Sequence, residues 1–260
     1  MKARATYNNA LQAEKNINIL IPMAGLGSRF NKSHPGELKP LIDVCGQTMF
    51  ERVILNLKQS NNIAFIIVAC KQTGSDANFL NILRKLEIKF KIILIDKVTQ
   101  GPAATCLLAK KYINNDAPLI IINCDQIIID FNLNNLLKFA NLNNADGVVG
   151  AFHSNSNKNS YIKLGEDLRI QEIKEKIVIS NIATNGVHLW TKGEDFVISA
   201  LEMIERNDRY SNEFYVAPTY NYLIKKGKNI IPFYYNRHYP IGTPEDLNFF
   251  TENVYENFKD

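Results

Sequence analysis

The sequence predicts an α/β protein with a Rossmann-like sheet that is mixed but mainly parallel and is flanked by helices. In the first 146 residues, β-branched runs alternate with segments of helical periodicity, which is typical of a parallel, doubly wound sheet. After about Asp146, strand-like pieces follow one another without helices between them, indicating antiparallel additions and a small β-rich part. Hydrophobic residues make up 46% of the chain, enough for a sizeable core.

The first half of the chain is expected to alternate buried strands and helices. Apolar side chains at helical spacing predict helices at residues 48–58 and 79–86. Pro102, well placed in a first helical turn, predicts another helix through about Lys111. Four apolar runs predict parallel strands, at residues 16–21, 63–70, 90–95 and 119–123, and the first, second and fourth are expected to be buried.

The second half, about residues 147–260, is expected to add strands before two helices, at residues 194–205 and 214–226. Thr243 and Pro244 mark a further helix start. Because no clean boundary separates the halves, residues 16–260 are predicted to form one domain after an N-terminal tail, residues 1–15. The expected strands cover residues 147–152, 161–164, 168–173, 177–179, 186–190 and 229–234.

Composition limits the classes of partner and compartment. The net charge is +4, and the 30 basic and 26 acidic residues are scattered, so we expect no nucleic-acid partner. No apolar run is long enough to span a bilayer, and residues 1–15 lack the apolar stretch of a signal peptide, so no membrane partner is expected. The four cysteines form no C-x-x-C pair, which favours a reducing cytoplasm.

The turn after the first strand carries the strongest motif. Residues 22–30 read PMAGLGSRF, and Lys39-Pro40-Leu41 follows. Small residues after a strand let backbone amides approach a triphosphate, and Arg29 and Lys39 add two positive charges. Phe30 occupies the place of a Rossmann glycine, and the Gly-Lys-Ser/Thr of a Walker loop is missing. Taken alone, the turn is also compatible with an ordinary glycine turn beside two solvated cations.

This motif resembles the signature of the sugar-nucleotide pyrophosphorylase family, and the resemblance runs from about residue 17 to 250. It implies the nucleotide-diphospho-sugar transferase fold, with nucleotide-binding and acceptor-binding halves. It also implies Mg²⁺-dependent transfer of a nucleoside monophosphate to a phosphorylated small molecule. Arg29 and Lys39 would be the catalytic cations that stabilise departing pyrophosphate. Nucleotide binding would involve both of them together with Met23, Ala24, Gly25, Leu26, Gly27, Ser28, Gln100, Gly101 and Ala103.

Two further segments, the Gln100-Gly101 turn and the loop with Asp125, complete the nucleotide-binding half of the resemblance. The strand-to-helix turn at Gln100-Gly101 would hold the base, since a glutamine amide can both donate and accept hydrogen bonds. Asp125, at the carboxyl end of a parallel strand, would hold Mg²⁺, which takes one or two protein carboxylates plus phosphate oxygens. The structural alternative for the Gln100-Gly101 turn is an ordinary helix start, and for Asp125 it is a turn or cap residue. Asp130 is a less favoured second ligand and is interpreted as the cap of the helix that follows it.

The acceptor side resembles the family's Glu-Lys-Pro segment, with Ile177 in place of the proline. The resemblance makes Lys176 a cation for the acceptor phosphate. Asn185, Gly186 and Glu213 complete the acceptor-binding set. The local pattern resembles a capsule-associated branch of the family, and CTP is favoured on that ground alone.

Pro240 is the main departure, because many relatives carry a second metal-binding aspartate there. Glu213 is the candidate for the missing ligand. A metal-dependent glycosyltransferase is one alternative, although Gln126 and Ile127 break the expected Asp-x-Asp. A non-catalytic, nucleotide-sensing relative is another. The interpretation leaves a homodimer open.

Overall fold

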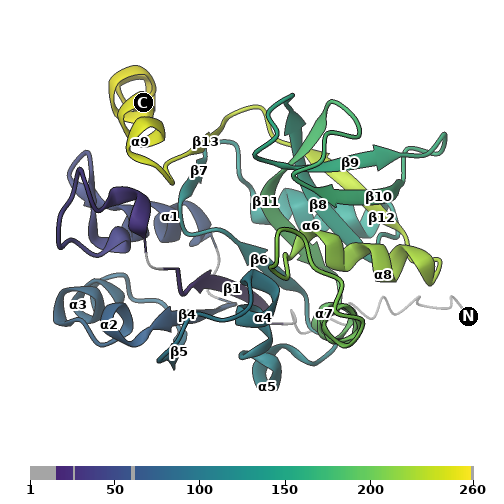
Figure 1. Cartoon of the computed structure of the whole chain (residues 1–260), viewed down its shortest axis with the longest axis horizontal. Helices are drawn as coiled ribbons and strands as arrows, with labels where there is room; N and C mark the ends of the chain where they lie inside the picture. Colours follow the sequence, from purple (N-terminus) through teal and green to yellow (C-terminus); the bar gives the residue numbers. More distant parts are fainter. Residues whose placement is uncertain (1–15, 26, 60–61, 259–260) are drawn as a thin grey trace, which may run out of the picture.

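The computed structural model describes residues 16–25, 27–59 and 62–258. A nine-stranded mixed sheet forms its centre, with helices on both sides (Figure 1). One path through the sheet runs in the order β10-β9-β11-β6-β1-β4-β5, and β8 and β12 continue it from β11. The predicted α/β class, with a mainly parallel core and a β-rich addition, is confirmed.

The parallel core consists of β6, β1, β4 and β5 in that order. All residues of β1 except Pro22 are buried, because neighbouring strands flank it and helices cover the sheet. The strand continues through Pro22 to Met23, two residues beyond its predicted end. The four strands span Ile17–Met23 (β1), Ile63–Cys70 (β4), Phe90–Ile95 (β5) and Leu119–Ile122 (β6).

The helices of the first half begin where capping residues place them. Thr48 caps α1 (Met49–Leu57) and forms a capping box with Glu51, which satisfies two free backbone amides. Asp76 caps α3 (Ala77–Lys85) and follows the single turn of α2 (Lys71–Gly74). The helix predicted from Pro102 to Lys111 is divided into α4 (Pro102–Leu107) and α5 (Lys110–Ile113).

The antiparallel addition is organised around β11 (Ile182–Trp190), which pairs with β8 (Gly147–His153) along one edge. Its other edge contacts β9 (Ser160–Leu164) at Ala183 and then β6 from Val187 onwards. The register against β8 shifts between Thr184 and His188, so β11 bends there. β10 (Ile170–Glu175) pairs with β9, and β12 (Ile230–Tyr234) runs parallel to β8.

Aromatic side chains fill the core beneath this addition. Trp190 stacks on Tyr220 with ring centroids 4.3 Å apart and meets Phe196 edge-on at 4.9 Å. Tyr220 and Phe196 belong to the helices that cover this part of the sheet. The remaining helices are α6 (Leu133–Leu142), α7 (Gly193–Glu205), η3 (Ala217–Thr219), α8 (Tyr220–Lys225), α9 (Pro244–Asn253) and η4 (Tyr255–Phe258).

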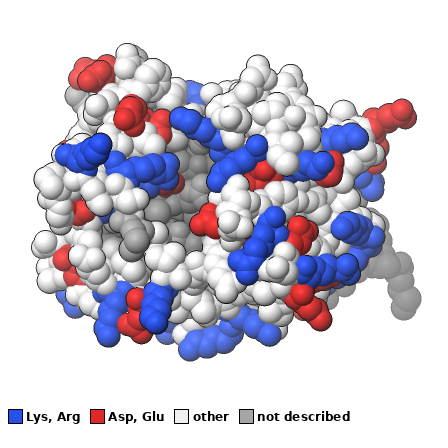
Figure 2. All heavy atoms as spheres, viewed as in Figure 1, with Lys and Arg blue, Asp and Glu red and all other residues white. Residues whose placement is uncertain are grey.

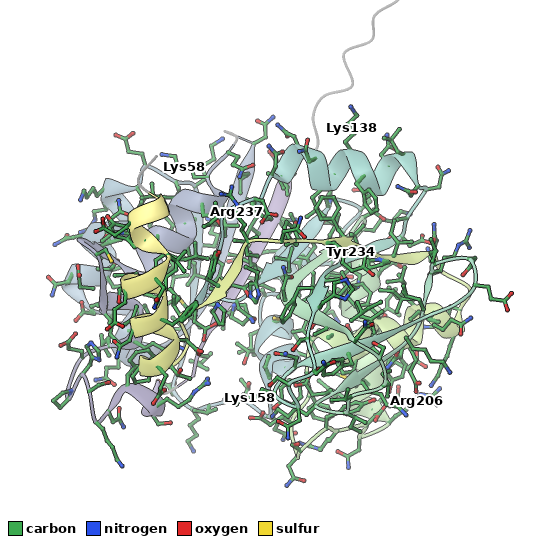
Figure 3. The ribbon with its side chains drawn as sticks, turned by 90° about the horizontal axis from the view of Figure 1, so that it is seen from above. Lys58, Lys138, Lys158, Arg206, Tyr234 and Arg237 are labelled. Atoms are coloured by element: carbon green, nitrogen blue, oxygen red, sulfur yellow. The ribbon has the colours of Figure 1, made fainter. Side chains whose placement is uncertain are left out.

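The chain returns from the β-rich part to the first half after β12. Figure 3 shows this crossing, with Tyr234 and Arg237 labelled along it. It ends in β13 (His238–Pro240), which pairs with β7 (Gln126–Ile128) directly after the Asp125 turn. Neither short strand was predicted. The other short elements are η1 (Ser28–Phe30), η2 (Lys39–Leu41), β2 (Asp43–Val44) and β3 (Gln47–Thr48).

Three local predictions were wrong. Residues 177–179 form no strand, since β10 ends at Glu175 and Lys176 adopts a positive φ of 54°. The helix predicted at 214–226 is shortened to η3 and α8. Asn132, and not Asp130, caps α6, because Asp130 accepts a hydrogen bond from the amide of Asn236 instead.

Two predictions concern the limits of the chain. The proposed N-terminal tail, residues 1–15, lies outside the described residues. The single domain over residues 16–260 stays a prediction. No helix in the described part of the chain is both long and apolar enough to cross a membrane.

Candidate functional site

The candidate site lies where adjacent parallel strands end. β1 and β6 pair side by side, so the loops that follow Met23 and Ile122 leave the same edge of the sheet. Figure 2 shows the molecule hollowed on one face between the part that carries α1 and the β-rich part, with Lys and Arg side chains around the rim. Such an edge is where open α/β sheets bind ligands.

Lys39 and Asp125 form the central contact of this edge. Lys39 Nζ lies 2.5 Å from Asp125 Oδ2, and the side chains are only 15% and 25% exposed. The backbone carbonyl of Asp125 accepts a hydrogen bond from Ile241, at 2.9 Å. A Cβ on Gly242 would lie 2.8 Å from Asp125 Oδ2, so a larger residue there would require the carboxylate to shift. The structure therefore brings together the predicted metal ligand and one predicted phosphate cation.

The glycine turn lies against Lys39. Gly27 adopts a left-handed φ of 64°, and a Cβ there would lie 2.9 Å from the Cβ of Lys39. The following η1 carries Ser28 and Arg29, both at the surface. Met23 and Ala24 are buried and Gly25 is exposed, whereas Leu26 lies outside the described residues.

The predicted base-binding turn is tied to a distant segment. Phe214 donates its amide to the Gln100 carbonyl and accepts from Ala103 N, both at 2.9 Å. Gly101 has a φ of 128°, and a Cβ there would lie 2.5 Å from the Phe214 nitrogen. Only glycine fits between the turn and this segment, which also carries Glu213.

Lys176 and Glu213 meet through a residue that the sequence did not indicate. Tyr215 donates its hydroxyl hydrogen to Glu213 Oε2 and accepts from Lys176 Nζ, both at 2.6 Å. The Lys176 ammonium also lies 4.8 Å from the centre of the Tyr215 ring. Burial, together with the neighbouring Glu213, raises the pKa of Tyr215, so its hydroxyl stays protonated. Tyr215 thus holds two predicted acceptor-binding side chains in one group.

Glu175 lies close enough to Lys176 and Glu213 for their charges to act on its carboxyl group. Its carboxylate is buried and accepts a hydrogen bond from the Ser160 hydroxyl. Burial raises the pKa of Glu175, while the Ser160 hydrogen bond and the charge of Lys176 oppose that shift.

The bend in β11 carries the other two predicted acceptor residues. Asn185 is 3% exposed and accepts from the Val187 amide at 3.2 Å. Gly186 has a φ of 79°, and a Cβ there would lie 2.4 Å from the side-chain nitrogen of Asn123, Nδ2. The bend therefore lies directly against the loop that leads to Asp125.

Two buried amide groups near this bend have an unpaired donor. Asn185 Nδ2 and Gln126 Nε2 have no hydrogen-bond partner among the residues that the structure describes. The other amide atom of Gln126 lies 3.1 Å from His238 Nε2. Burial lowers the pKa of His238 to about 4, so its ring is neutral near pH 7. Unpaired buried donors are uncommon in proteins and often mark functional sites.

The donor set around Asp125 is sparse for a metal. Across the described chain, no group of three or more His, Cys, Asp or Glu side chains could hold a metal ion. Pro240 pairs with Gln126 in the short ladder and offers no carboxylate. Glu213 is engaged by Tyr215. A single carboxylate still fits Mg²⁺, which takes most of its other ligands from water and phosphate oxygens.

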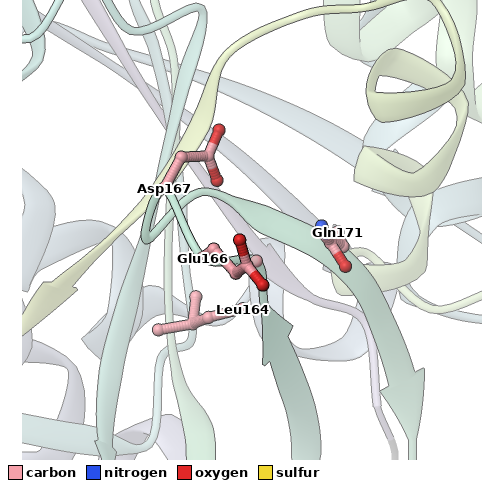
Figure 4. A pocket seen from close by; sticks show the side chains of 5 residues that line it. Leu164, Glu166, Asp167 and Gln171 are labelled. Atoms are coloured by element: carbon pink, nitrogen blue, oxygen red, sulfur yellow. The ribbon is translucent and has the colours of Figure 1, made fainter.

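A separate hollow of about 460 Å³ lies at the turn between β9 and β10 (Figure 4). None of the predicted site residues lines it. We therefore do not assign the reaction to this hollow, whose lining residues are Leu164, Gly165, Glu166, Asp167 and Gln171.

The chain belongs to the nucleotidyl transferase family, whose model matches residues 20–253. The chain is also 26% identical over 255 residues to the bifunctional protein GlmU of Methanococcus vannielii. That match covers 92% of this chain but 56% of the relative, so the chain spans about half the length of that curated relative.

Solved structures share the fold. A nucleoside-diphosphate-sugar pyrophosphorylase from Vibrio cholerae RC9 has a TM-score of 0.78 at 24% identity, covering 90% of this chain and all of its own. A UDP-glucose pyrophosphorylase complexed with UDP-glucose gives 0.74 at 17% identity, with 93% and 99% covered. The inositol-1-phosphate CTP transferase from T. maritima gives 0.72 at 18%, with 95% and 96% covered.

Proposed function

We propose that the chain transfers the nucleoside monophosphate part of a nucleoside triphosphate to a phosphorylated small molecule and releases pyrophosphate. The observation that carries this proposal is the Lys39–Asp125 pair beside the Gly27 turn, at the carboxyl ends of β1 and β6. In this proposal the cation would neutralise the triphosphate and the carboxylate would hold Mg²⁺.

The reaction requires no general base. A phosphate oxygen of the acceptor is already ionised at neutral pH and attacks the α-phosphorus in line. The new bond joins this oxygen to the α-phosphorus, and the bond to the oxygen bridging the α- and β-phosphorus breaks. The electron pair leaves with pyrophosphate. Catalysis then consists of positioning and charge neutralisation.

The chain's residues divide this work. Arg29 and Lys39 would neutralise the triphosphate and the departing pyrophosphate, while Lys176 would hold the acceptor phosphate. Tyr215 would keep Lys176 in place through its hydroxyl and ring. Mg²⁺ held by Asp125 would supply further charge neutralisation between the reacting phosphates.

We favour CTP as the donor and an acceptor used in capsular polysaccharide modification. The acceptor-side sequence resembles CTP:phosphoglutamine cytidylyltransferase, and phosphoglutamine is therefore the first acceptor to test. Sugar 1-phosphates are next, since solved structures of the same fold are described as acting with UDP-glucose and with inositol 1-phosphate and CTP.

The match over residues 20–253 favours nucleotidyl transfer over glycosyl transfer. A non-catalytic, nucleotide-sensing relative remains the second candidate, because Pro240 replaces the second aspartate of many relatives.

A pyrophosphate-release screen tests the proposal. Each of ATP, CTP, GTP, UTP and dTTP is combined with phosphoglutamine, phosphocholine and a set of sugar 1-phosphates in the presence of Mg²⁺. We expect release with CTP and phosphoglutamine. Turnover only with UTP or dTTP and a sugar 1-phosphate would contradict the substrate preference. Nucleotide binding without pyrophosphate release from any pair would favour the sensing candidate.

A further inference from the structure

Residues 209–215, here called the bridge segment, contact both halves of the candidate site. Its Phe214 backbone bonds to the Gln100 turn, and its Tyr215 bonds to Lys176. Arg209, at its start, reaches the Gln100 side chain across 109 positions of sequence. This last contact was not indicated by the sequence and is the starting point of the inference.

Three hydrogen bonds and one aromatic ring hold the Arg209 guanidinium. Its Nε donates to Asn207 Oδ1 at 2.6 Å, its Nη1 to the Asn212 carbonyl at 3.1 Å, and its Nη2 to Gln100 Oε1 at 2.5 Å. The guanidinium also lies 4.1 Å from the centre of the Phe214 ring. A planar guanidinium held by three hydrogen bonds and one ring keeps a fixed orientation.

This orientation determines which way the Gln100 amide faces. The two amide atoms of a glutamine are nearly alike in shape, and their assignment follows from the hydrogen bonds they make. A guanidinium can donate but never accept, so the Gln100 atom that faces Arg209 must be the oxygen. The exposed amide group then presents its N–H donors away from Arg209.

The main chain of the turn is fixed relative to Arg209 as well. Phe214 and the Gln100–Ala103 turn exchange two backbone hydrogen bonds, and Gly101 leaves no space between them. With the backbone of the turn held, the Gln100 side chain could still rotate about its own bonds. The hydrogen bond from Arg209 to Gln100 Oε1 prevents this rotation.

We infer that Arg209 is a positioning residue that makes Gln100 a hydrogen-bond donor to the nucleotide base, and so selects cytosine over uracil. The O2 oxygen accepts hydrogen bonds in both bases, so the selection lies at N3, which is an acceptor in cytosine. Uracil carries an N3–H donor between its two carbonyl oxygens, which would oppose a donor from Gln100. The inference rests on the proposed function, since it takes Gln100 to face the base.

The test measures dissociation constants of CTP and UTP for the full chain with Mg²⁺ by calorimetry, which requires no acceptor. We expect wild type to bind CTP about tenfold more tightly than UTP, the worth of one well-paired hydrogen bond. Arg209→Met keeps an apolar stem against Phe214 but loses the donors. Its CTP/UTP ratio should fall to within about threefold of unity, because the amide is then free to turn.

Further variants separate positioning from charge and from folding. Arg206, which is labelled in Figure 3, pairs with Glu202. Arg206→Met removes the same charge as Arg209→Met and should leave the CTP/UTP ratio unchanged. Arg209→Lys keeps the charge without the fork and should also lose selectivity. Gln100→Ala should abolish the ratio, and adding Arg209→Met to it should change nothing more.

Two negative outcomes have different meanings. If Arg209→Met weakens CTP and UTP equally, or leaves the ratio intact, Arg209 has only a structural role and the inference is overturned. If wild type binds neither CTP nor UTP, the proposed use of CTP is overturned, and the inference that rests on it falls with it.

Discussion

At the scale of single residues, the Lys39–Asp125 pair is the most consequential contact. Both side chains are largely withdrawn from water. Removing one partner therefore leaves the other charge poorly solvated, whereas removing both does not. Single and double variants of the pair should therefore separate its effect on the free energy of unfolding from its effect on the reaction rate.

We expect Lys39→Met and Asp125→Asn each to lower pyrophosphate release by about a hundredfold or more, since in the proposed function each residue would bring a charge to the reacting phosphates, Asp125 through Mg²⁺. Each single variant should lose roughly 1–2 kcal/mol of unfolding free energy, and the double variant less than their sum. Steady-state kinetics and urea unfolding measure the two effects. Near-normal turnover in both single variants would reject the assignment.

His188 gives a second prediction at this scale. It is buried beside Trp190 and Tyr220, and burial lowers its pKa from 6.5 to about 3. Below about pH 6.5 the unfolded chain takes up a proton that the folded chain refuses. Stability contributed by the neutral ring is therefore lost as the pH falls.

Between pH 7 and pH 5, this residue should cost about 2 kcal/mol of unfolding free energy. His188→Leu cannot titrate, so its loss over the same interval should be smaller by that amount, whatever its absolute stability. Urea unfolding at both pH values measures the difference. Parallel losses in the two proteins would show that His188 is not the titrating group.

At the scale of elements, the bend in β11 connects the sheet to the site. The antiparallel strand changes partners from β9 to β6 at this point, and Gly186 makes the change possible. The glycine is needed for two reasons, a left-handed φ and the close approach of Asn123. The chain offers a control for the first reason alone, since Gly227 has a φ of 76° and, beyond its two neighbours in the chain, none of the described residues places an atom within 4 Å of the position that a Cβ would take.

Gly227→Ala should cost about 1 kcal/mol of unfolding free energy from backbone strain. Gly186→Ala, at a φ of 79°, should cost clearly more and should also lower pyrophosphate release, because its Cβ displaces Asn123 two residues before Asp125. Thermal unfolding and the release assay compare the variants. Equal effects in both would mean that the bend does not support the site.

At the scale of the whole molecule, one sheet joins the two halves. β11 belongs to the second half of the sequence yet pairs with β6 from the first. The return crossing adds a second link, since β13 pairs with β7. The halves therefore share buried strands, which favours the single domain predicted for residues 16–260.

A shared sheet should unfold in one cooperative step. Trp190, the chain's one tryptophan, lies on β11 and reports on that junction. Its fluorescence and the far-UV circular dichroism should follow the same urea curve. If the tryptophan signal changed before the backbone signal, the halves would be separate folding units.

An element could be predicted when the interactions that form it join residues close together in the sequence. Strands β1, β4 and β6 were found because a strand buried on both faces needs a continuous apolar run, and β5, at the edge of the sheet and only partly buried, was found from its apolar residues. The start of α1 at Met49, directly after its cap Thr48, was close to its prediction because capping is local. The strand predicted at 177–179 failed because Ile177 and Val178 are apolar yet exposed.

The sequence by itself determined the parallel core and the order of the motifs along the chain, because apolar periodicity, glycines and prolines act on neighbouring residues. Only the tertiary structure decided that Lys39 meets Asp125, that Tyr215 joins Lys176 to Glu213, and that Arg209 orients Gln100. These contacts join residues from separate elements, so no local pattern encodes them. They arise when the sheet brings distant loops to one edge.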